Sequence, residues 1–355
     1  MKTIPTLPEA LPRLLTEWYQ KNARDLPWRH DREPYHIWLS EIMLQQTRVE
    51  AVKGYYARFL ESCPTIEALA QAAPELVQKL WEGLGYYSRV RNLQSAAKKI
   101  MAEHDGQFPQ DYDTVRSLPG IGPYTAGAIM SIAYDAPTPA VDGNVLRVLT
   151  RLLTWDDPIT QEKTKRAAEA ALKEIYPPES GTFTQSLMEL GATVCLPNGE
   201  PKCSECPIRS LCRAGQDGTW QNYPVKELKK PRRIEEHTVL VLRCDDCQAV
   251  RKRPARGLLA DLWEYPNVDG TLNADEALNL AEQWGCEPGG LTMQLDRVHI
   301  FTHVQWNLRC YYIECRKMPP EFTWATAETL KNEIALPTAF RMFFMEAIPP
   351  SPGIS

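Results

Sequence analysis

The spacing of hydrophobic residues changes near residue 236, and this change constrains the fold more than any other feature of the sequence. Before it, apolar residues recur at helical spacing, and no segment shows the two-residue alternation of a strand. After it, runs such as HTVLVLRC indicate strands, with one helix expected near 274–284. We therefore predict an all-α region over residues 1–213, a linker over 214–235 and a separate α+β domain over 236–355.

Length and composition are those of an ordinary globular protein. The 355 residues allow two domains, and 43% of them are hydrophobic and 24% charged. The net charge is −5, so bulk charge gives no support for a nucleic-acid partner. If DNA is the partner, backbone amides, aromatic side chains and local basic clusters must supply the contacts.

The N-terminal residues lack the basic and apolar pattern of a secretory signal, and no apolar run approaches the length of a membrane span. We therefore expect a protein without membrane association. Its expected location is the cytoplasm, associated with the nucleoid, in a bacterium, or the nucleus in a eukaryote. In such a reducing compartment the ten cysteines are expected to be metal ligands or free thiols.

Four of these cysteines lie close together in a loop that contains proline and glycine: Cys195, Cys203, Cys206 and Cys212. A loop of this composition cannot build its own core, so its thiolates indicate a metal site. Tetrahedral zinc and a [4Fe–4S] cluster both fit, and the spacing does not separate them. The second CxxC, at residues 244–247, is interpreted as a strand turn with two incidental cysteines.

A glycine-rich turn precedes a predicted helix from Tyr124 to about Tyr134. Gly120 and Gly122 bracket Ile121, and the N–H groups that open the following helix lie at its positive end. Such a turn can approach DNA closely and bind a phosphodiester oxygen without a lysine. A helix–helix turn without a ligand is the alternative, and the glycines alone would favour it.

Two carboxylates are candidates for acid-assisted chemistry. Glu41 lies within IWLSEIML, a helical segment that is apolar nearly all round, where burial should raise its pKa. Asp142 begins DGNVLRVLTRLL and should cap a helix whose positive end and N–H groups keep it ionised. Cleavage of a glycosidic bond uses one protonated and one ionised carboxyl. A buried ion pair at Glu41 and a purely structural cap at Asp142 remain open as alternatives.

Aromatic and polar side chains suited to nucleic-acid contacts occur in three places. Trp28 lies between Arg24 and Arg29, so its ring can stack on a base or simply fill the core. Residues 45–47 (Gln-Gln-Thr) end a predicted helix and suit hydrogen bonds to base edges. Residues 83–86 (Gly-Leu-Gly-Tyr) form a second glycine turn, which carries an apolar wedge and an aromatic ring.

The order of these motifs resembles that of the helix-hairpin-helix DNA glycosylases, and within them the MutY-type adenine DNA glycosylases. The resemblance covers most of the chain through LPWR (26–29), SEIMLQQTRV (40–49), WEGLGYYSRVRNL (81–93), LPGIGPYTAGAI (118–129), VDGNVLRV (141–148), the cysteine loop, GLLADLWEYP (257–266) and FTH (301–303). It implies a multidomain fold: an all-α helix-hairpin-helix core with a [4Fe–4S] loop, then an α+β Nudix-like domain. A six-helix module is expected at about 28–135, and an iron–sulfur module in the N-terminal helix plus about 136–213.

The resemblance implies that a mispaired adenine is flipped out of the duplex and its N-glycosidic bond hydrolysed. Glu41 is then the proton donor, and Asp142 the carboxylate that stabilises or bonds to the sugar. The other implied sites are Tyr124 and Asn144 in the catalytic pocket; Trp28, Arg29 and Gln185 around adenine; Gln46, Thr47, Leu84, Tyr86, Gly120 and Gly122 on DNA; Thr302 and His303 on 8-oxoguanine; and Cys195, Cys203, Cys206 and Cys212 on the cluster. The implied partner is double-stranded DNA with A:8-oxoguanine or A:G mispairs, bound by a monomer.

Tyr124 separates this reaction from a related one. In relatives of the endonuclease III type this position holds a lysine that forms a Schiff base with the sugar, which tyrosine cannot do. The alternatives are a bifunctional endonuclease III-like glycosylase/lyase for oxidised pyrimidines and a non-enzymatic iron–sulfur DNA-binding protein. Residues 257–287 lack the clustered Arg-Glu and Glu-Glu set that binds magnesium in Nudix hydrolases, so the C-terminal domain is interpreted as a recognition module.

Overall fold

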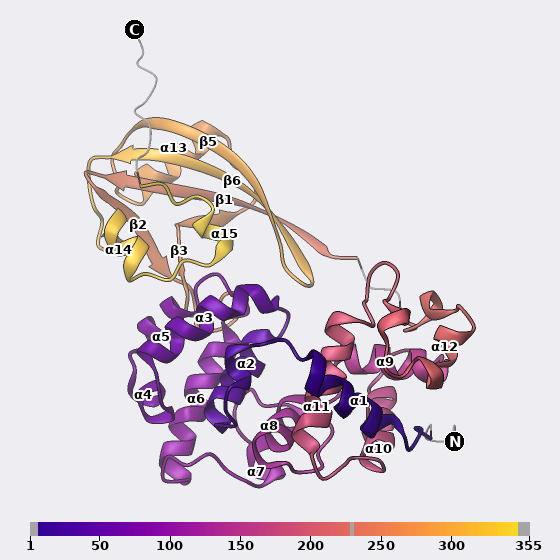
Figure 1. The fold of residues 1–355 in the computed structure, drawn as a ribbon. Helices are drawn as coiled ribbons and strands as arrows, with labels where there is room; N and C mark the ends of the chain where they lie inside the picture. The colour runs from indigo at the N-terminus through magenta and orange to yellow at the C-terminus, as the bar shows by residue number, and fades with distance from the viewer. Residues whose placement is uncertain (1–5, 228–230, 347–355) are drawn as a thin grey trace. The chain divides into compact units, whose positions relative to one another are not determined.

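The structure, a computed structural model, describes residues 6–227 and 231–346 (Figure 1). The chain divides into two compact units, and neither is continuous in sequence. The helical unit comprises residues 1–71 and 92–228, and the sheet unit comprises residues 72–91 and 229–355. Among the described residues, no helix is both long and apolar enough to cross a membrane.

The described part of the helical unit contains helices and no strand, which confirms the predicted all-α region. Short 3-10 helices occur at Pro27–Arg29, Cys203–Glu205, Arg209–Leu211 and Trp220–Asn222. The α-helices are α1 (Leu11–Asn22), α2 (Pro34–Leu44), α3 (Val49–Ser62), α4 (Ile66–Gln71), α6 (Ser88–Glu103, whose first turn belongs to the sheet unit), α7 (Tyr112–Arg116), α8 (Pro123–Tyr134), α9 (Gly143–Leu153), α10 (Glu162–Lys173), α11 (Ser180–Thr193) and α12 (Arg213–Gln216).

The N-terminal helix packs against helices from the far end of the helical unit. Leu11 and Leu15 of α1 are fully buried in one core with residues of α9, α10 and α11, such as Leu149 and Leu187. Figure 1 shows α1, drawn in indigo, running beside the pink helix α11. Residues distant in sequence therefore share this core.

The segment after α8 runs back tightly along that helix and delivers Asp142 to its position. Asp135, the C-cap of helix α8, adopts a left-handed conformation with φ 50°. A Cβ atom at Gly127 of α8 would lie 2.1 Å from the carbonyl oxygen of Pro139. Only glycine allows so close an approach, so residue 127 sets the course of the connection into α9.

The sheet unit is built on a mixed sheet in the order β3-β2-β1-β6-β5, with β4 paired to β1 and β7 paired to β2. Strands β1 and β6 are parallel, and the other pairs are antiparallel. Its elements are α5 (Pro74–Leu80), β1 (Arg233–Cys244), β2 (Cys247–Lys252), β3 (Trp263–Glu264), β4 (Asn267–Asp269), α13 (Ala274–Gln283), β5 (Pro288–Ile300), β6 (Val304–Cys315), β7 (Thr323–Thr326), α14 (Ala327–Asn332) and α15 (Thr338–Arg341).

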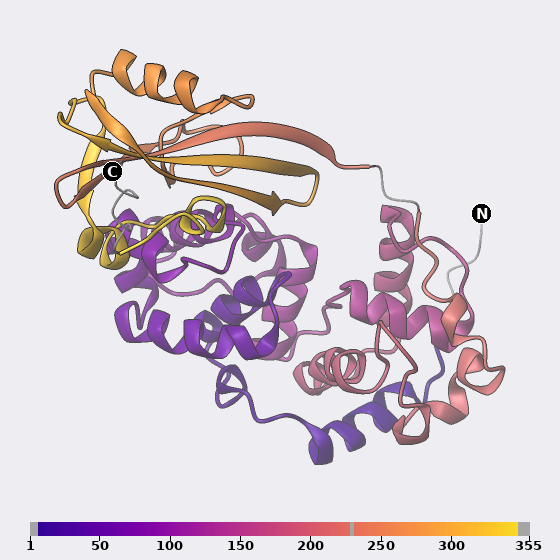
Figure 2. The ribbon, with the colours of Figure 1, turned by 90° about the horizontal axis from the view of Figure 1, so that it is seen from above.

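Helices cover both faces of this sheet, which confirms the predicted α+β region. Helix α13 buries Ala277 and Ala281 against one face, and the segment that contains α14 and α15 buries Leu330 and Phe340 against the other. Figure 2 shows the orange helix α13 and the yellow C-terminal segment on opposite sides of the strands. Alternate residues of β1 and β6 point into the two cores, because successive side chains of a strand point to opposite faces of the sheet.

The predicted linker over 214–235 is largely structured. Helix α12 lies at its start, the N–H of Ile159 donates to the carbonyl of Val225 at 3.0 Å, and strand β1 begins at Arg233. Residues up to 227 therefore pack on the helical unit, because their backbone groups find partners there. The basic residues Lys229 and Lys230 fall outside the described residues.

Two further expectations, about the CxxC at residues 244–247 and about residues 72–91, can be compared with the structure. Cys244 and Cys247 face each other across the β1–β2 turn, which confirms the interpretation of this CxxC as a strand turn. Residues 72–91, by contrast, were expected to belong only to the helical region. They form a compact unit with the strands instead, because polar groups on and after α5 bond to the C-terminal segment, as described below.

Candidate active site

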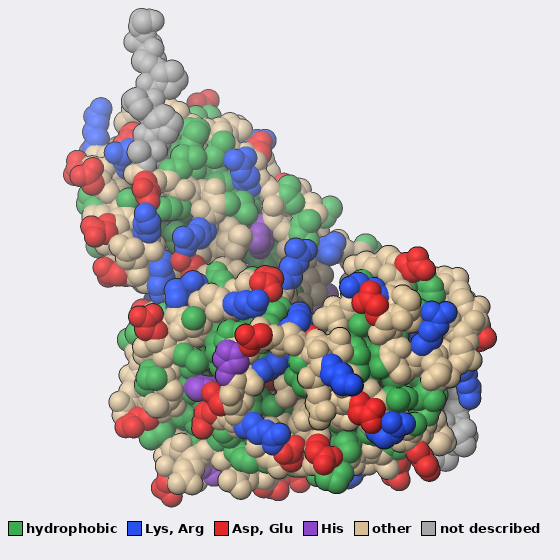
Figure 3. Space-filling model, viewed as in Figure 1, with side chains coloured by type: hydrophobic (Ala, Val, Ile, Leu, Met, Phe, Trp, Pro, Cys, Tyr) green, Lys and Arg blue, Asp and Glu red, His purple; other side chains and the backbone are tan. Residues whose placement is uncertain are grey.

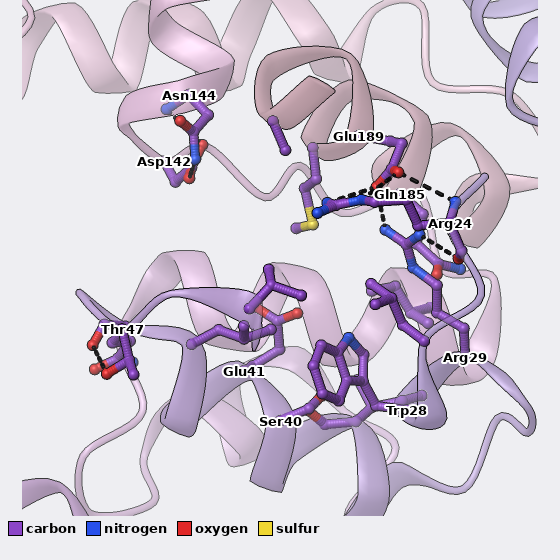
Figure 4. A pocket seen from close by; sticks show the side chains of 18 of the residues that line it. Arg24, Trp28, Arg29, Ser40, Glu41, Thr47, Asp142, Asn144, Gln185 and Glu189 are labelled. Atoms are coloured by element: carbon purple, nitrogen blue, oxygen red, sulfur yellow. Dashed lines mark hydrogen bonds and ion pairs between the residues drawn. The ribbon is translucent and has the colours of Figure 1, made fainter. Parts of the chain in front are cut away.

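A cavity of about 690 Å³ in the helical unit brings together all four catalytic candidates. Its walls come from the segment before α2, from α2 and the turn after it, and from the starts of α8 and α9 and the middle of α11. Nine predicted site residues line it: Trp28, Arg29, Glu41, Gln46, Thr47, Tyr124, Asp142, Asn144 and Gln185. Figure 4 shows Asp142 and Asn144 on one side of the cavity and Glu41 on the opposite side.

Glu41 is a buried carboxyl with one strong hydrogen bond. It is 7% exposed and accepts a bond of 2.8 Å from the Tyr124 hydroxyl at Oε2. Burial raises the pKa of Glu41 to about 7, although the bond from Tyr124 opposes this shift. The predicted upward shift is confirmed. The alternative of an ion pair with an arginine is not found among the described residues, since Arg29 pairs with Glu189 instead.

Asp142 caps helix α9, as predicted. Its Oδ1 accepts bonds of 2.8 Å from the N–H groups of Asn144 and Val145, and its Oδ2 accepts one of 2.7 Å from the Asn144 side chain. Three N–H donors thus hold both oxygens in one orientation. Arg147 in turn donates to the Asn144 side-chain oxygen at 3.0 Å, which fixes the amide.

The helix end and its N–H groups were expected to keep Asp142 ionised, and the net shift of its pKa runs against that expectation. Desolvation at the cavity wall raises the pKa of Asp142, and the bonds from Val145 and Asn144 only offset part of this effect. The pKa values of both carboxyls are therefore raised, and they differ in their bonding. Asp142 accepts three N–H bonds that favour its ionised form, whereas Glu41 accepts one O–H bond.

The Tyr124 hydroxyl interacts electrostatically with both carboxyls, those of Glu41 and Asp142. Burial and the nearby carboxyls of Glu41 and Asp142 raise the pKa of Tyr124 well above its usual value. Its hydroxyl therefore stays protonated and donates to Glu41. Tyr124 is the second residue of α8, directly after the glycine turn, so the turn determines where this hydroxyl lies.

One wall of the cavity is an ion cluster that the sequence analysis did not identify as a site. The Glu189 carboxylate is fully buried and pairs with Arg24 Nε at 2.6 Å and Arg29 Nη2 at 2.7 Å. Burial raises its pKa, but the two arginines together leave the pKa of Glu189 below its usual value. Glu189 lies one helical turn after Gln185 on α11, and this i, i+4 spacing is the signal that could have found it.

Trp28 and Gln185 complete this wall (Figure 4). The Trp28 ring is buried and meets Tyr56 edge to face at a centroid distance of 5.5 Å. The Gln185 side-chain oxygen accepts a bond of 3.0 Å from the Tyr19 hydroxyl on α1. The wall therefore combines an aromatic surface with polar groups whose orientations are fixed by their partners.

The glycine turn does not line this cavity. Gly120 has φ +78°, and a Cβ there would lie 2.6 Å from the Cβ of Asn92, so glycine is required at this position for two reasons. Gly122 is the N-cap of α8, with Pro123 at its first position. The turn and the close approach of Asn92 explain why residue 120 is glycine. Contact of Gly120 and Gly122 with DNA stays a prediction.

The remaining DNA-contacting candidates belong to the sheet unit. Leu84 is only 7% exposed, whereas Tyr86 is 46% exposed in a left-handed conformation with φ 48°. The Tyr86 hydroxyl and the Thr302 hydroxyl form a hydrogen bond of 2.7 Å, and Thr302 and His303 are both exposed in the β5–β6 turn. Leu84, which was expected to act as the wedge, is therefore buried, whereas the Tyr86 ring is exposed.

The four cysteines of the 195–212 loop line one small cavity with apolar neighbours such as Leu190 and Ile208. Arg151 Nη1 lies 3.3 Å from Cys195 Sγ, and the Gly215 N–H donates to Cys212 Sγ at 3.4 Å. These donors and the apolar lining suit a group bound by thiolates. Among the described residues, no set of three or more His, Cys, Asp or Glu is arranged to hold a single metal ion.

Comparison with known proteins shows the general class of protein to which the chain belongs. Residues 39–178 match the family described as HhH-GPD superfamily base excision DNA repair protein, and residues 237–346 match the NUDIX domain. The fold is similar to a thermostable thymine-DNA glycosylase, at 25% identity and a TM-score of 0.52 over 59% of this chain and 96% of that one. A non-covalent endonuclease III–DNA complex matches at 26% identity and a TM-score of 0.50 over 60% and 99% of the two chains.

The curated relatives narrow this class. Adenine DNA glycosylase from Rattus norvegicus is 35% identical over 94% of this chain and 77% of the relative. The corresponding proteins from Mus musculus and Homo sapiens are 36% and 35% identical, over 93% of this chain and 77% and 72% of their own lengths. The chain belongs to the adenine DNA glycosylase family. It is thus a base-excision-repair enzyme, and the alternative of a non-enzymatic DNA-binding protein is wrong.

Proposed function

We propose that the protein hydrolyses the N-glycosidic bond of adenine opposite 8-oxoguanine or guanine in double-stranded DNA, and that it does so as a monomer. The observation that carries this proposal is the pair of carboxyls across one cavity. The pKa of Glu41 is raised to about 7, so a large share of this carboxyl carries a proton near neutral pH, and Asp142 is held by three N–H donors. A cavity of about 690 Å³ is large enough for a nucleoside that has been flipped out of the duplex.

The carboxyls divide the reaction between the two ends of the breaking bond. Glu41 transfers its proton to the departing adenine, which leaves as a neutral base with the bonding electron pair. The sugar becomes cationic, and the Asp142 carboxylate stabilises that charge or adds to the anomeric carbon. Water then supplies the hydroxyl, and its proton returns to a carboxylate. The Tyr124 hydroxyl keeps Glu41 Oε2 in place during these steps.

The cavity wall formed by Trp28, Arg29, Gln185 and Glu189 supports adenine as the base that is removed. Trp28 offers a flat apolar surface, while Arg29 and Glu189 hold each other in a fixed geometry beside it. A site of rigid donors and acceptors discriminates strongly against bases that leave its buried polar groups unpaired. Gln185 adds an amide to the cavity lining, and its oxygen accepts a hydrogen bond from the Tyr19 hydroxyl.

The proposal of hydrolysis without lyase activity is tested on duplexes with and without alkali. None of the described residues that line the cavity is a lysine, and Tyr124 occupies the position after the glycine turn. We expect adenine release from A:8-oxoguanine and A:G duplexes, with strand cleavage only after alkali. Strand scission without alkali on a duplex with oxidised thymine, together with no action on A:8-oxoguanine, would identify the endonuclease III-like alternative instead.

The pH dependence of excision follows from the pKa of Glu41. The acid must be protonated, so the single-turnover rate is expected to fall about tenfold per pH unit well above pH 7. At low pH, protonation of Asp142 lowers the rate as well. Tyr124→Phe removes a bond that lowers the pKa of Glu41, so its alkaline limb should move to higher pH. A wild-type rate that is independent of pH to about pH 9 contradicts this assignment.

The sheet unit is proposed to read the base opposite adenine. Thr302 and His303 are exposed on one turn, and the Tyr86 hydroxyl bonds to Thr302. A hydroxyl and an imidazole can both hydrogen-bond to a purine edge. Figure 3 shows basic and acidic side chains interspersed over the visible face. Since the net charge of the chain is −5, local contacts of this kind are proposed to carry much of the DNA recognition.

The four cysteines of the 195–212 loop are proposed to hold a [4Fe–4S] cluster. Four thiols around one cavity, with N–H donors to two of the sulfurs, support this. In a zinc site the sulfurs would converge to about 3.8 Å from one another, whereas a cluster spreads them over four iron corners. When bound, the cluster would join Cys195, which follows α11, to Cys203, Cys206 and Cys212, and so would hold this loop in one conformation.

Loss of one cysteine ligand is expected to remove iron. Purified wild-type protein should be brown with about four iron atoms per chain, and Cys206→Ser should lose iron and melt at a lower temperature. Cys247→Ser, a cysteine at the β1–β2 turn, is the matched control and should keep its iron. A colourless wild-type protein with stoichiometric zinc would overturn the cluster proposal.

A further inference from the structure

The loop that carries Tyr86 begins at a carboxylate that is almost completely buried. Glu82 lies two residues after the end of helix α5, and its side chain is 7% exposed. Acidic side chains are rarely buried to this extent unless they are paired. Glu82 is not part of the catalytic cavity, and no step of the reaction described above uses it.

The Glu82 carboxylate has both charged and backbone partners within the sheet unit. Its Oε2 pairs with Lys79 Nζ at 2.8 Å and with the Arg341 guanidinium, and its Oε1 accepts a bond of 2.9 Å from the Leu336 N–H. Lys79 Nζ also donates to the carbonyls of Leu330 and Ile334, at 3.3 and 3.0 Å. We call Lys79, Glu82 and Arg341 the Glu82 cluster.

The Glu82 cluster ties the end of α5 to the segment that contains α14 and α15. One acid holds two cations from two different elements, and a backbone N–H fixes its second oxygen. Removing one member of a buried ion cluster leaves the others uncompensated, which is far more costly than losing an exposed pair. The pair of Glu75 and Lys252 in the same unit is such an exposed pair, with side chains 53% and 48% exposed.

The loop that follows Glu82 is held at two further points. Arg89 Nη2 donates to the carbonyls of Leu84 and Gly85 at 3.0 Å each, although Gly83, Gly85 and Tyr86 all have positive φ angles. The tip of the loop meets the β5–β6 turn through the bond of 2.7 Å between the Tyr86 and Thr302 hydroxyls. Glu82 therefore anchors the start of the loop to the same unit that carries Thr302.

We propose that Glu82 is a positioning residue for the recognition of 8-oxoguanine. Through the Glu82 cluster it fixes the Tyr86 loop on the sheet unit, so that the Tyr86 ring and the Thr302 hydroxyl reach the base opposite adenine in one arrangement. This inference rests on the proposed role of the sheet unit in reading 8-oxoguanine. A purely structural role of Glu82 would lower stability and both excision rates together.

The test compares single-turnover excision from A:8-oxoguanine and A:G duplexes by full-length, cluster-loaded protein. Glu82→Gln keeps the shape of the side chain and removes its charge. We expect the ratio of the two rates to fall about tenfold, the range found for directly coupled positions, with most of the loss on A:8-oxoguanine. Glu75→Gln, the same change on the exposed pair of α5, should leave the ratio unchanged within about twofold.

A double-mutant cycle with Thr302→Val separates positioning from general destabilisation. If Glu82 acts through the Tyr86–Thr302 contact, its substitution should have little further effect on the ratio in Thr302→Val. Additive effects, or equal losses on both duplexes, overturn the inference. If Glu82→Gln fails to fold, Arg341→Gln, whose side chain is nearer the surface, should lower the ratio in the same direction, and an unchanged ratio there also overturns it.

The same measurements distinguish this inference from the proposed function. A wild-type protein without preference for A:8-oxoguanine over A:G overturns both. A wild-type preference that Thr302→Val erodes and Glu82→Gln leaves intact overturns only the role of Glu82.

Discussion

Asp142→Asn is expected to reduce excision of adenine by at least about 10³-fold while DNA binding is retained, since a fixed charge beside a developing cation in a water-excluded site contributes on this scale. Asparagine is as good a helix N-cap as aspartate, so the two backbone bonds from Asn144 and Val145 to the side-chain oxygen can persist. The substitution therefore removes the negative charge with little change to the start of α9. The measurement is the single-turnover rate alongside the dissociation constant for a duplex with an A:8-oxoguanine mispair.

Asp111→Asn provides the matched control for this variant. Asp111 caps helix α7 by accepting a bond of 2.9 Å from the Thr114 N–H, but it is exposed and does not line the cavity. It should excise adenine at the wild-type rate. A rate for Asp142→Asn within about tenfold of wild type would show that the charge is not needed, and the proposed mechanism would then be wrong.

Glu41→Gln is expected to lower the excision rate by about 10²–10⁴-fold, the usual contribution of a general acid. Glutamine has nearly the same shape and can still accept the bond from the Tyr124 hydroxyl, but it has no acidic proton to give to the leaving adenine. The residual rate should also lose the alkaline limb that the pKa of Glu41 imposes on the wild type. Single-turnover rates across the pH range measure both effects at once.

Glu33→Gln is the matched control for the acid. It makes the same change at an exposed position at the start of the same helix, α2, and should leave rate and pH profile unaltered. If Glu41→Gln keeps an alkaline limb of wild-type shape, another group is the acid. Unchanged melting temperatures in both variants would show that the comparison concerns chemistry and not folding.

Local patterns were sufficient to predict the features that depend on neighbouring residues. The burial of Glu41 followed from the apolar residues on every side of it in the sequence, and the cap at Asp142 followed from its place before an apolar helix. The switch from helices to strands was likewise visible as a change of period. Its position differed by only three residues from Arg233, where β1 begins.

Features that depend on distant residues were not predicted. The pKa of Asp142 is set by desolvation in a cavity whose walls come from several helices, and the capping motif alone suggested the opposite direction. The pairing of Arg24 with Glu189 joins residues that are 165 positions apart. The association of residues 72–91 with the strands also escaped prediction, because a buried acid such as Glu82 has no local signature until its partners are known.

The packing of α1 against α9, α10 and α11 has a consequence for how the protein is made. Helix α1 leaves the ribosome well before its core partners, which lie more than 100 residues downstream, so its apolar face, with Leu11 and Leu15, stays uncovered while most of the helical unit is synthesised. The wall that contains Arg24 and Glu189 closes only after α11 has emerged. The nascent chain must therefore complete this unit before it has a base-binding cavity, and fragments that end before α11 are expected to be inactive and prone to aggregate.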